Sequence, residues 1–179
     1  RFPATVNPYG VMYNPASVLH TVERWIAEQD GRVPPFTFLT LGTNHVYRLR
    51  ETGEIVDNCQ KRPQRLFQEE VLTVEQCVDF LAEAVEALRS RRDDAQVIVT
   101  VSPIRYAKYG FHGSQLSKAA LLMAADELVR HYPDHVTYFP AYEIVLDELR
   151  DYRFYQPDML HPSGQAVEYI WERLTETFL

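Results

Sequence analysis

Short apolar segments alternate with amphipathic helical patterns along the chain, and this alternation limits the fold more than any other feature. The predicted strands are rich in β-branched and aromatic residues and occupy positions 2–7, 36–41, 96–101 and 136–140. The predicted helices occupy roughly positions 15–29, 73–91, 114–131, 144–150 and 166–178. Strands that alternate with helices in this way favour an α/β fold, in which helices cover both faces of a parallel sheet.

The length and composition of the chain suit a single domain over residues 1–179. With 46% apolar and 24% charged residues, the sequence has the balance of a globular protein, which argues against disorder and against a transmembrane span. In parallel sheets, polar residues at the carboxyl ends of strands collect in one crevice. The residues from Gly42 to Asn44, together with Ser102, occupy such ends.

Residues 47–71 carry no clear periodicity, because Pro, Gly, Arg and Glu are mixed there. We predict a long excursion with little regular structure. Loops of this length inside compact domains are often functional.

The net charge of −7 opposes the phosphate backbone of nucleic acids, so no nucleic-acid partner is expected. Two cysteines are too few for a disulfide scaffold. Cys77 falls on an apolar helical stripe and is predicted to be a buried thiol. The chain starts at Arg1 without a charged leader or an apolar signal segment, and a cytoplasmic location is the resulting expectation.

The segment Asp158-Met159-Leu160-His161, directly before the last helical stripe, contains the clearest chemistry. Residues three apart in a loop that enters a helix can face the same way, so Asp158 can accept the Nδ1 proton of His161 and leave Nε2 free as a base. This is the acid and base half of a hydrolytic triad. A solvated ion pair and a metal site are the alternatives, although no further His, Asp or Glu cluster has ligand spacing. We expect no metal and no cofactor.

A nucleophile for such a triad is not evident in the sequence. Ser102 precedes a proline at a strand end, and Ser114 and Ser163 have the pattern of helix caps. None of these residues, nor Ser117, is predicted to be the nucleophile.

Two further features add a family resemblance to this pattern. A strand followed by Gly42-Thr43-Asn44, with Asp158-x-x-His161-Pro162 before the last helix, resembles the SGNH (GDSL-like) hydrolases. Within that superfamily the chain resembles the GSCFA-domain family, through Asn7-Pro8-Tyr9-Gly10, Asn14-Pro15, Thr40-Leu41-Gly42-Thr43, Asn58-Cys59, Thr100-Val101-Ser102-Pro103, Leu116-Ser117-Lys118, Phe139-Pro140-Ala141-Tyr142-Glu143 and Arg150-Asp151-Tyr152-Arg153-Phe154-Tyr155.

The resemblance implies a flavodoxin-like sheet and assigns roles to residues of this chain. Asp158 and His161 would be the acid and base, and Asn44 would donate to the oxyanion, with ordinary turn chemistry as its alternative. Gly42 and Thr43 would flank the oxyanion site, and Gly10 resembles a glycine whose backbone N–H is a second donor. His45 departs from the superfamily, which usually has Asp after this Asn.

The resemblance also implies a missing part. The Gly-Ser-Cys-Phe-Ala motif, which carries the nucleophilic serine, would lie upstream of Asn7, and the chain does not contain it. We therefore expect the 179 residues to be part of a longer polypeptide, whose upstream strand would lie between residues 2–7 and residues 36–41.

The implied function is a serine esterase that acts on ester-linked acyl groups, with O-acylated carbohydrate as one candidate substrate. A non-catalytic module that binds a glycan or another polar ligand is the alternative. The run from Arg150 to Tyr155 either faces the substrate or buttresses the catalytic loop, and we favour the buttress. The sequence predicts no oligomeric state.

Overall fold

A three-stranded parallel sheet is at the centre of the computed structural model, which describes residues 13–57, 59 and 61–178. Its strands are β1 (Phe36–Leu41), β5 (Gln96–Val101) and β6 (Val136–Phe139), in the order β1-β5-β6. All pairs are parallel, and Leu41 at the end of β1 lies opposite Val101 at the end of β5. The carboxyl ends of these strands therefore share one edge. The predicted strand at residues 2–7 and Gly10 lie outside the described residues.

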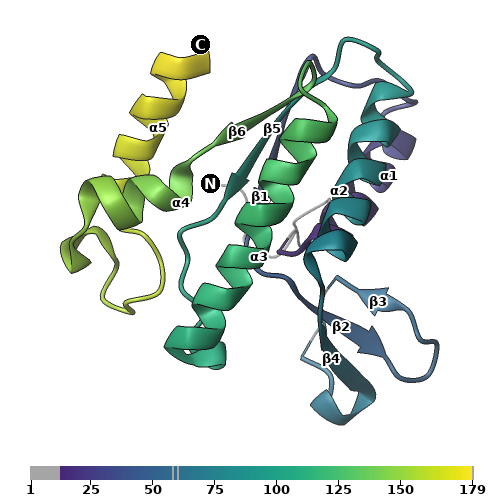
Figure 1. Ribbon diagram of the computed structural model, residues 1–179. Helices are drawn as coiled ribbons and strands as arrows, with labels where there is room; N and C mark the ends of the chain where they lie inside the picture. Colours follow the sequence, from purple (N-terminus) through teal and green to yellow (C-terminus); the bar gives the residue numbers. More distant parts are fainter. Residues whose placement is uncertain (1–12, 58, 60, 179) are drawn as a thin grey trace.

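Helices cover both faces of this sheet, which confirms the predicted α/β class (Figure 1). One face packs against α1 (Pro15–Glu28), α2 (Val74–Arg89) and α3 (Gly110–His131). The other face packs against α4 (Ala141–Glu143), the π-helix η3 (Ile144–Leu149) and α5 (Gly164–Phe178). Two short 3-10 helices, η2 (Ala107–Tyr109) and η4 (Tyr152–Phe154), lie in the loops after β5 and before α5.

Two of the helices begin where their capping residues predict. The side chain of Asn14 accepts from the N–H of Ser17 at 2.9 Å, and Pro15 stands at the first helical position of α1. At the start of α2, Thr73 and Gln76 form a capping box.

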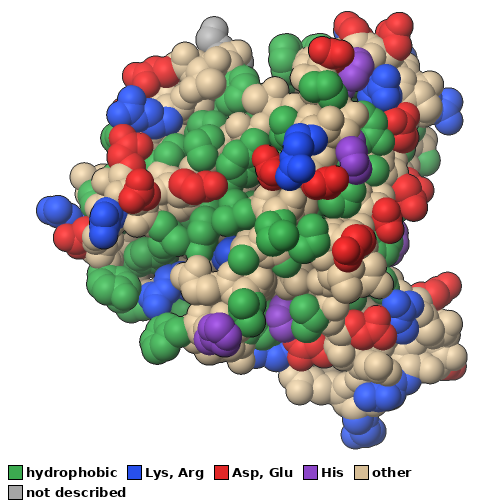
Figure 2. Space-filling model, in the orientation of Figure 1, with side chains coloured by type: hydrophobic (Ala, Val, Ile, Leu, Met, Phe, Trp, Pro, Cys, Tyr) green, Lys and Arg blue, Asp and Glu red, His purple; other side chains and the backbone are tan. Residues whose placement is uncertain are grey.

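Residues that alternate along each strand point to opposite faces of the sheet and pack into two different cores. Leu39 and Leu41 of β1 pack toward α1, α2 and α3, where Cys77 is fully buried as predicted. Ile98 of β5 and Phe139 of β6 point to the opposite face and contact α5. The hydrophobic side chains that remain visible gather between α3 and the region of α4 and α5 (Figure 2).

One edge of strand β1 has no partner strand among the described residues. Among the described residues β1 pairs only with β5, and Phe36 and Phe38 are 54% and 43% exposed. Exposed aromatic side chains on a strand edge are unusual in a finished sheet. The upstream strand expected from the sequence would lie next to β1, and its existence stays a prediction.

The prediction of little regular structure over residues 47–71 is wrong. A second, antiparallel sheet forms there, in the order β3-β2-β4. Its strands are β2 (His45–Leu49), β3 (Ile55–Val56) and β4 (Phe67–Val71), with the 3-10 helix η1 (Gln64–Leu66) before β4.

The second sheet lacks the apolar alternation that identifies strands in a sequence, because polar contacts across the strands stabilise it. Arg48 donates to Glu70 through both Nε and Nη2 at 3.1 Å, and Tyr47 donates to Glu69. Most of its side chains are half-buried or exposed. Strands of this kind resemble loops in composition.

Helix α3 begins at Gly110, four residues before its predicted start near Ser114. The two glycines of this stretch, Gly110 and Gly113, lie within the helix. Ser114 is thus inside the helix and does not cap it, and its hydroxyl accepts from the N–H of Tyr106 at 3.3 Å. No helix in the described part of the chain is long and apolar enough to cross a bilayer.

Candidate active site

The loop before α5 holds Asp158 and His161 as a hydrogen-bonded pair. The Nδ1 atom of His161 lies 2.6 Å from Oδ2 of Asp158. Because an ionised carboxylate can only accept, Nδ1 carries the proton in this arrangement and Nε2 is left as a base. The hydrogen bond between Asp158 and His161 that the sequence predicts is therefore present.

Asp158 is fixed by the backbone as well as by the imidazole. Its Oδ1 atom accepts from the N–H groups of Leu160 at 2.9 Å and His161 at 3.0 Å. These two backbone bonds, followed by the bond from the imidazole, lower the pKa of Asp158 to about 2. The carboxylate is therefore charged at neutral pH and oriented toward the ring.

The backbone of the loop is folded back on itself to present this pair. Met159 has a φ of 60°, in the left-handed region, and its N–H donates to the carbonyl of Gln156 at 2.8 Å. The N–H of Gln156 in turn donates to the carbonyl of His161 at 2.8 Å. An isolated antiparallel bridge between Tyr155 and Pro162 closes the base of the loop.

Arg105, in the segment after β5, supports the same loop from outside. Its backbone N–H donates to the carbonyl of Leu160 at 3.0 Å, and its Nη1 donates to the carbonyl of Met159 at 2.8 Å. Its guanidinium carbon also lies 5.5 Å from the ring centres of both Tyr152 and Tyr155. Tyr152 and Tyr155 thus contact the arginine that holds the loop, and they also face the space beside it. The buttress role of the run from Arg150 to Tyr155 stays a prediction.

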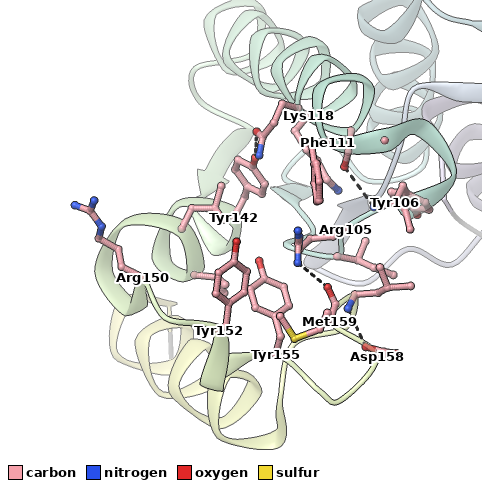
Figure 3. A pocket seen from close by; sticks show the side chains of 18 of the residues that line it. Arg105, Tyr106, Phe111, Lys118, Tyr142, Arg150, Tyr152, Tyr155, Asp158 and Met159 are labelled. Atoms are coloured by element: carbon pink, nitrogen blue, oxygen red, sulfur yellow. Dashed lines mark hydrogen bonds between the residues drawn. The ribbon is translucent and has the colours of Figure 1, made fainter.

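That space is a pocket of about 900 Å³ between α3, the loop after β5 and the loop that holds Asp158 (Figure 3). Its walls carry five aromatic rings, from Tyr106, Phe111, Tyr142, Tyr152 and Tyr155. Asp158 is on the wall, together with the cationic side chains of Arg105, Lys118 and Arg150. Its volume lies in the range usual for small-molecule sites.

Lys118 is the most deeply buried charged residue of this wall, with 2% of its surface exposed. Its Nζ donates to the carbonyls of Gly42 at 2.6 Å and Ser102 at 2.7 Å, which directly follow β1 and β5. Burial lowers its pKa to about 7. Lys118 therefore joins the ends of two strands at the edge where the pocket opens.

Gly42 leaves no room for a side chain at this edge. A Cβ atom there would lie 2.6 Å from the Tyr106 hydroxyl and 3.1 Å from the carbonyl of Tyr13. The N–H groups of Gly42 and Thr43 both donate to that carbonyl, at 2.9 and 2.8 Å. Both amides are thus occupied by the protein itself.

Asn44 is buried and is not among the residues that line the pocket. It is 3% exposed, its amide donates to the carbonyl of Leu72 at 2.8 Å, and its own carbonyl accepts from the N–H of Leu72 at 2.9 Å. Its Oδ1 atom has no partner among the described residues. Two hydrogen bonds between Asn44 and Leu72 thus connect the segment after β1 with the segment before α2. The oxyanion role of Asn44 stays a prediction.

His45 and Thr43 also make contacts near the end of β1, and neither residue lines the pocket. The ring of His45 stacks on Tyr109 with ring centres 3.6 Å apart, and its Nδ1 lies 3.2 Å from Glu69. Burial is the main cause that lowers the pKa of His45. The Thr43 hydroxyl lies 3.2 Å from that of Ser117.

The serines considered in the sequence lie in structural contacts. Ser102 accepts from the N–H of Ile104 at 3.3 Å, and Ser163 accepts from the N–H of Ala166 at 3.3 Å, as a helix cap does. In the described residues no serine hydroxyl is bonded to the His161 ring. No group of three or more His, Cys, Asp or Glu side chains in those residues is placed to hold a metal ion.

Arg105 and Lys118 were not predicted from the sequence as residues of the pocket. A signal existed for Lys118, which occupies the same helical stripe as the buried residues Leu121 and Ala125. A lysine at a core position of a helix needs partners that a sequence pattern does not reveal. Arg105 gave no signal, because the two carbonyls to which it donates, those of Met159 and Leu160, lie more than 50 positions away.

Comparison with known proteins places these features in a wider group. The sequence model of the GSCFA family matches residues 33–174. No curated protein matches the sequence significantly.

Two solved structures share the fold at 12% sequence identity, and each alignment covers 92% of this chain and 66% of the other chain. One is an acetyl esterase with a serine-to-alanine substitution, solved with an acetate ion, at a TM-score of 0.54. The other is a carbohydrate esterase of family 3 from Talaromyces cellulolyticus, at a TM-score of 0.53. The chain thus spans just under two thirds of their length, and the likeness concerns the fold alone.

Proposed function

Because the chain belongs to the GSCFA family, we propose that it supplies the acid and base of an SGNH-type serine hydrolase that cleaves ester-linked acyl groups. The nucleophile in this proposal is a serine upstream of Arg1 in the full polypeptide. O-acylated carbohydrates are the proposed substrates, by analogy with the esterases whose fold the chain shares.

The observation that carries the proposal is the bond of 2.6 Å between His161 and an Asp158 that two backbone amides also hold. A carboxylate fixed in this way keeps the imidazole in one tautomer and stabilises the imidazolium that forms during proton transfer. Asp158, the partner of His161 in this bond, lines a pocket large enough for a sugar ester.

In the proposed mechanism the serine hydroxyl attacks the ester carbonyl while Nε2 of His161 takes its proton. The imidazolium then returns the proton to the departing alcohol oxygen, which leaves an acyl-enzyme. Water repeats the sequence, releases the carboxylic acid and restores the serine.

The oxyanion of the tetrahedral intermediate needs donors that are held in place. We assign this role to Asn44, whose amide has a second N–H beyond the one given to Leu72. Gly10 would add a backbone donor. Gly42 and Thr43 position Asn44, since their own amides are bonded to Tyr13.

A fluorophosphonate probe tests the assignment of the nucleophile. The full natural polypeptide should gain the mass of one probe, mapped by peptide mass spectrometry to a serine upstream of Arg1. Labelling of Ser102, Ser114, Ser117 or Ser163 would instead refute the upstream nucleophile.

The role of His161 is tested by turnover of 4-nitrophenyl acetate. His161→Ala should abolish turnover and leave the thermal unfolding curve unchanged. His131→Ala is a matched control, because both imidazoles are 53% exposed and pair with a carboxylate on their own segment. Equal activities of the two variants would remove His161 from the mechanism.

A non-catalytic binding module remains the second candidate. The described residues place no nucleophile beside His161, and a pocket with aromatic and cationic walls suits binding without turnover. Failure of the full polypeptide to react with the probe, together with retained ligand binding, would favour this candidate.

A further inference from the structure

Two cationic side chains on the pocket wall have no acidic partner among the described residues. Arg105 donates one side-chain hydrogen bond, to the carbonyl of Met159. Lys118 donates to two backbone carbonyls and to no carboxylate. For Lys118, which is buried, a charge without a counter-charge is costly, and most proteins avoid it.

The acidic groups of the same wall are already engaged. Asp158 accepts from two backbone amides and from His161. Asp151 accepts from the N–H of Arg153 at 2.8 Å and lies 3.5 Å from the Nε of that arginine. Neither acidic side chain is therefore ion-paired with Arg105 or Lys118 among the described residues.

Both cations are held in place by aromatic rings. The guanidinium of Arg105 lies between Phe111, at 5.8 Å from the ring centre, and the pair Tyr152 and Tyr155 (Figure 3). Lys118 lies 5.3 Å from the ring centre of Tyr106. Figure 3 shows the third cation, Arg150, pointing away from these side chains.

We propose that the pocket binds a sugar ester that carries a carboxylate, with Arg105 and Lys118 as the partners of that carboxylate. The Arg105 fork has four N–H donors that no acceptor among the described residues uses, and a guanidinium matches a carboxylate in shape. The ammonium of Lys118 has one further N–H. The tyrosine and phenylalanine faces suit the C–H groups of a sugar ring.

This inference rests on the proposed esterase function and adds the charge of the substrate to it. The ligand supplies the negative charge that the folded chain lacks at this place. Neutral acylated sugars bring no charged partner for Arg105 or Lys118 and should bind more weakly.

Binding is tested without turnover, with D-glucuronate and its neutral methyl ester as probes. Each is titrated into the ¹⁵N-labelled full polypeptide, and the shifts of amide signals give the dissociation constants. We expect the glucuronate dissociation constant to be about 10-fold lower or more, which is the size of a charge-assisted hydrogen bond.

Substitutions identify the partners of the carboxylate. Arg105→Gln and Lys118→Met should each reduce the preference for glucuronate over its methyl ester by about 10-fold. Arg105→Lys, which keeps the charge and loses the fork, should reduce it less. Arg153→Gln is the control, because it removes a positive charge from η4, and Arg153 does not line the pocket.

The preference ratio separates charge recognition from support of the loop. A variant that merely loosens the loop weakens both ligands equally, and such a result for both Arg105→Gln and Lys118→Met would overturn the inference. Equal binding of the two probes to the unmodified protein would do the same. An inactive protein that still prefers glucuronate supports this inference while refuting the esterase, whereas an active esterase without the preference refutes this inference alone.

Discussion

Replacing Lys118 with Met should change how the stability of the protein depends on pH. Burial lowers the pKa of Lys118 from its ordinary 10.5 to about 7 in the folded chain. Between these two values the unfolded chain keeps a proton that the folded chain has released. Stability rises with pH wherever the unfolded state binds more protons, so Lys118 makes the folded state more stable as the pH increases from 7 to 10.5.

The magnitude follows from the size of the pKa shift. Each pH unit inside the window is worth about 1.4 kcal/mol, which gives about 2 to 3 kcal/mol between pH 6 and pH 9. Methionine has a similar shape and no charge, so Lys118→Met should lose this increment. It also leaves the carbonyls of Gly42 and Ser102 without a donor, at a cost of about 1 to 3 kcal/mol at every pH.

Urea denaturation of both proteins at pH 6 and pH 9 measures the effect. The destabilisation caused by Lys118→Met should be about 2 to 3 kcal/mol larger at pH 9 than at pH 6. Groups common to both proteins cancel in this difference. Burial raises the pKa of Tyr106 to about 12, so measurements stay below pH 10.

Lys108→Met is the matched control for this experiment. Hydrogen bonds to Glu69 and Tyr47 raise the pKa of Lys108 despite some desolvation, so this lysine stays protonated in both states between pH 6 and pH 9. Its removal should alter stability by the same amount at both pH values. An equal pH response of the two variants would refute the claim that burial depresses the pKa of Lys118.

Three further substitutions test other parts of the site. Asp158→Asn should lower kcat of the active full polypeptide by about 10⁴, because the amide forces the wrong imidazole tautomer. The loss of stability should be small, since the amide oxygen can still accept from the N–H groups of Leu160 and His161. Retained ester turnover would exclude the triad role. Asn44→Ala should lower kcat by about 10² to 10³ if the residue donates to the oxyanion, and a change confined to KM would mean ground-state binding instead. The same variant should lose about 1 to 3 kcal/mol of stability by urea denaturation, since the carbonyl of Leu72 loses its buried donor. Gly42→Ala should cost about 1 to 3 kcal/mol, because the added Cβ meets Tyr106 and the carbonyl of Tyr13; Gly164→Ala, with open space around its Cβ, is the control and should be neutral or slightly stabilising.

The main sheet and its helices could be predicted because their signals are local. The runs at positions 36–41 and 96–101 are rich in β-branched, aromatic and other apolar residues. Asn14 and Thr73 mark the starts of their helices through bonds to residues three positions away. The pairing of Asp158 with His161 is local in the same sense.

The rest depends on contacts between distant parts of the chain. The strands β2 and β4 are held by the pairing of Arg48 with Glu70, which is invisible until the strands are aligned. Likewise, the bonds of Lys118 to the carbonyls of Gly42 and Ser102 depend on the sheet register. Asn44 was read from a motif, and only the fold shows that Leu72 occupies one of its donors.

The contacts of Arg105 with Met159 and Leu160 also bear on how this chemistry could be moved to another protein. Besides the hydrogen bonds within its own loop, the tetrapeptide from Asp158 to His161 is held by Arg105, which lies in the segment after β5. A graft of these four residues onto a foreign scaffold would carry the reactive groups but not the strand end that holds their backbone. Searches for the short signature by itself should therefore recover many chains that cannot use it, whereas a search that also requires an arginine just after the preceding central strand would be far more selective.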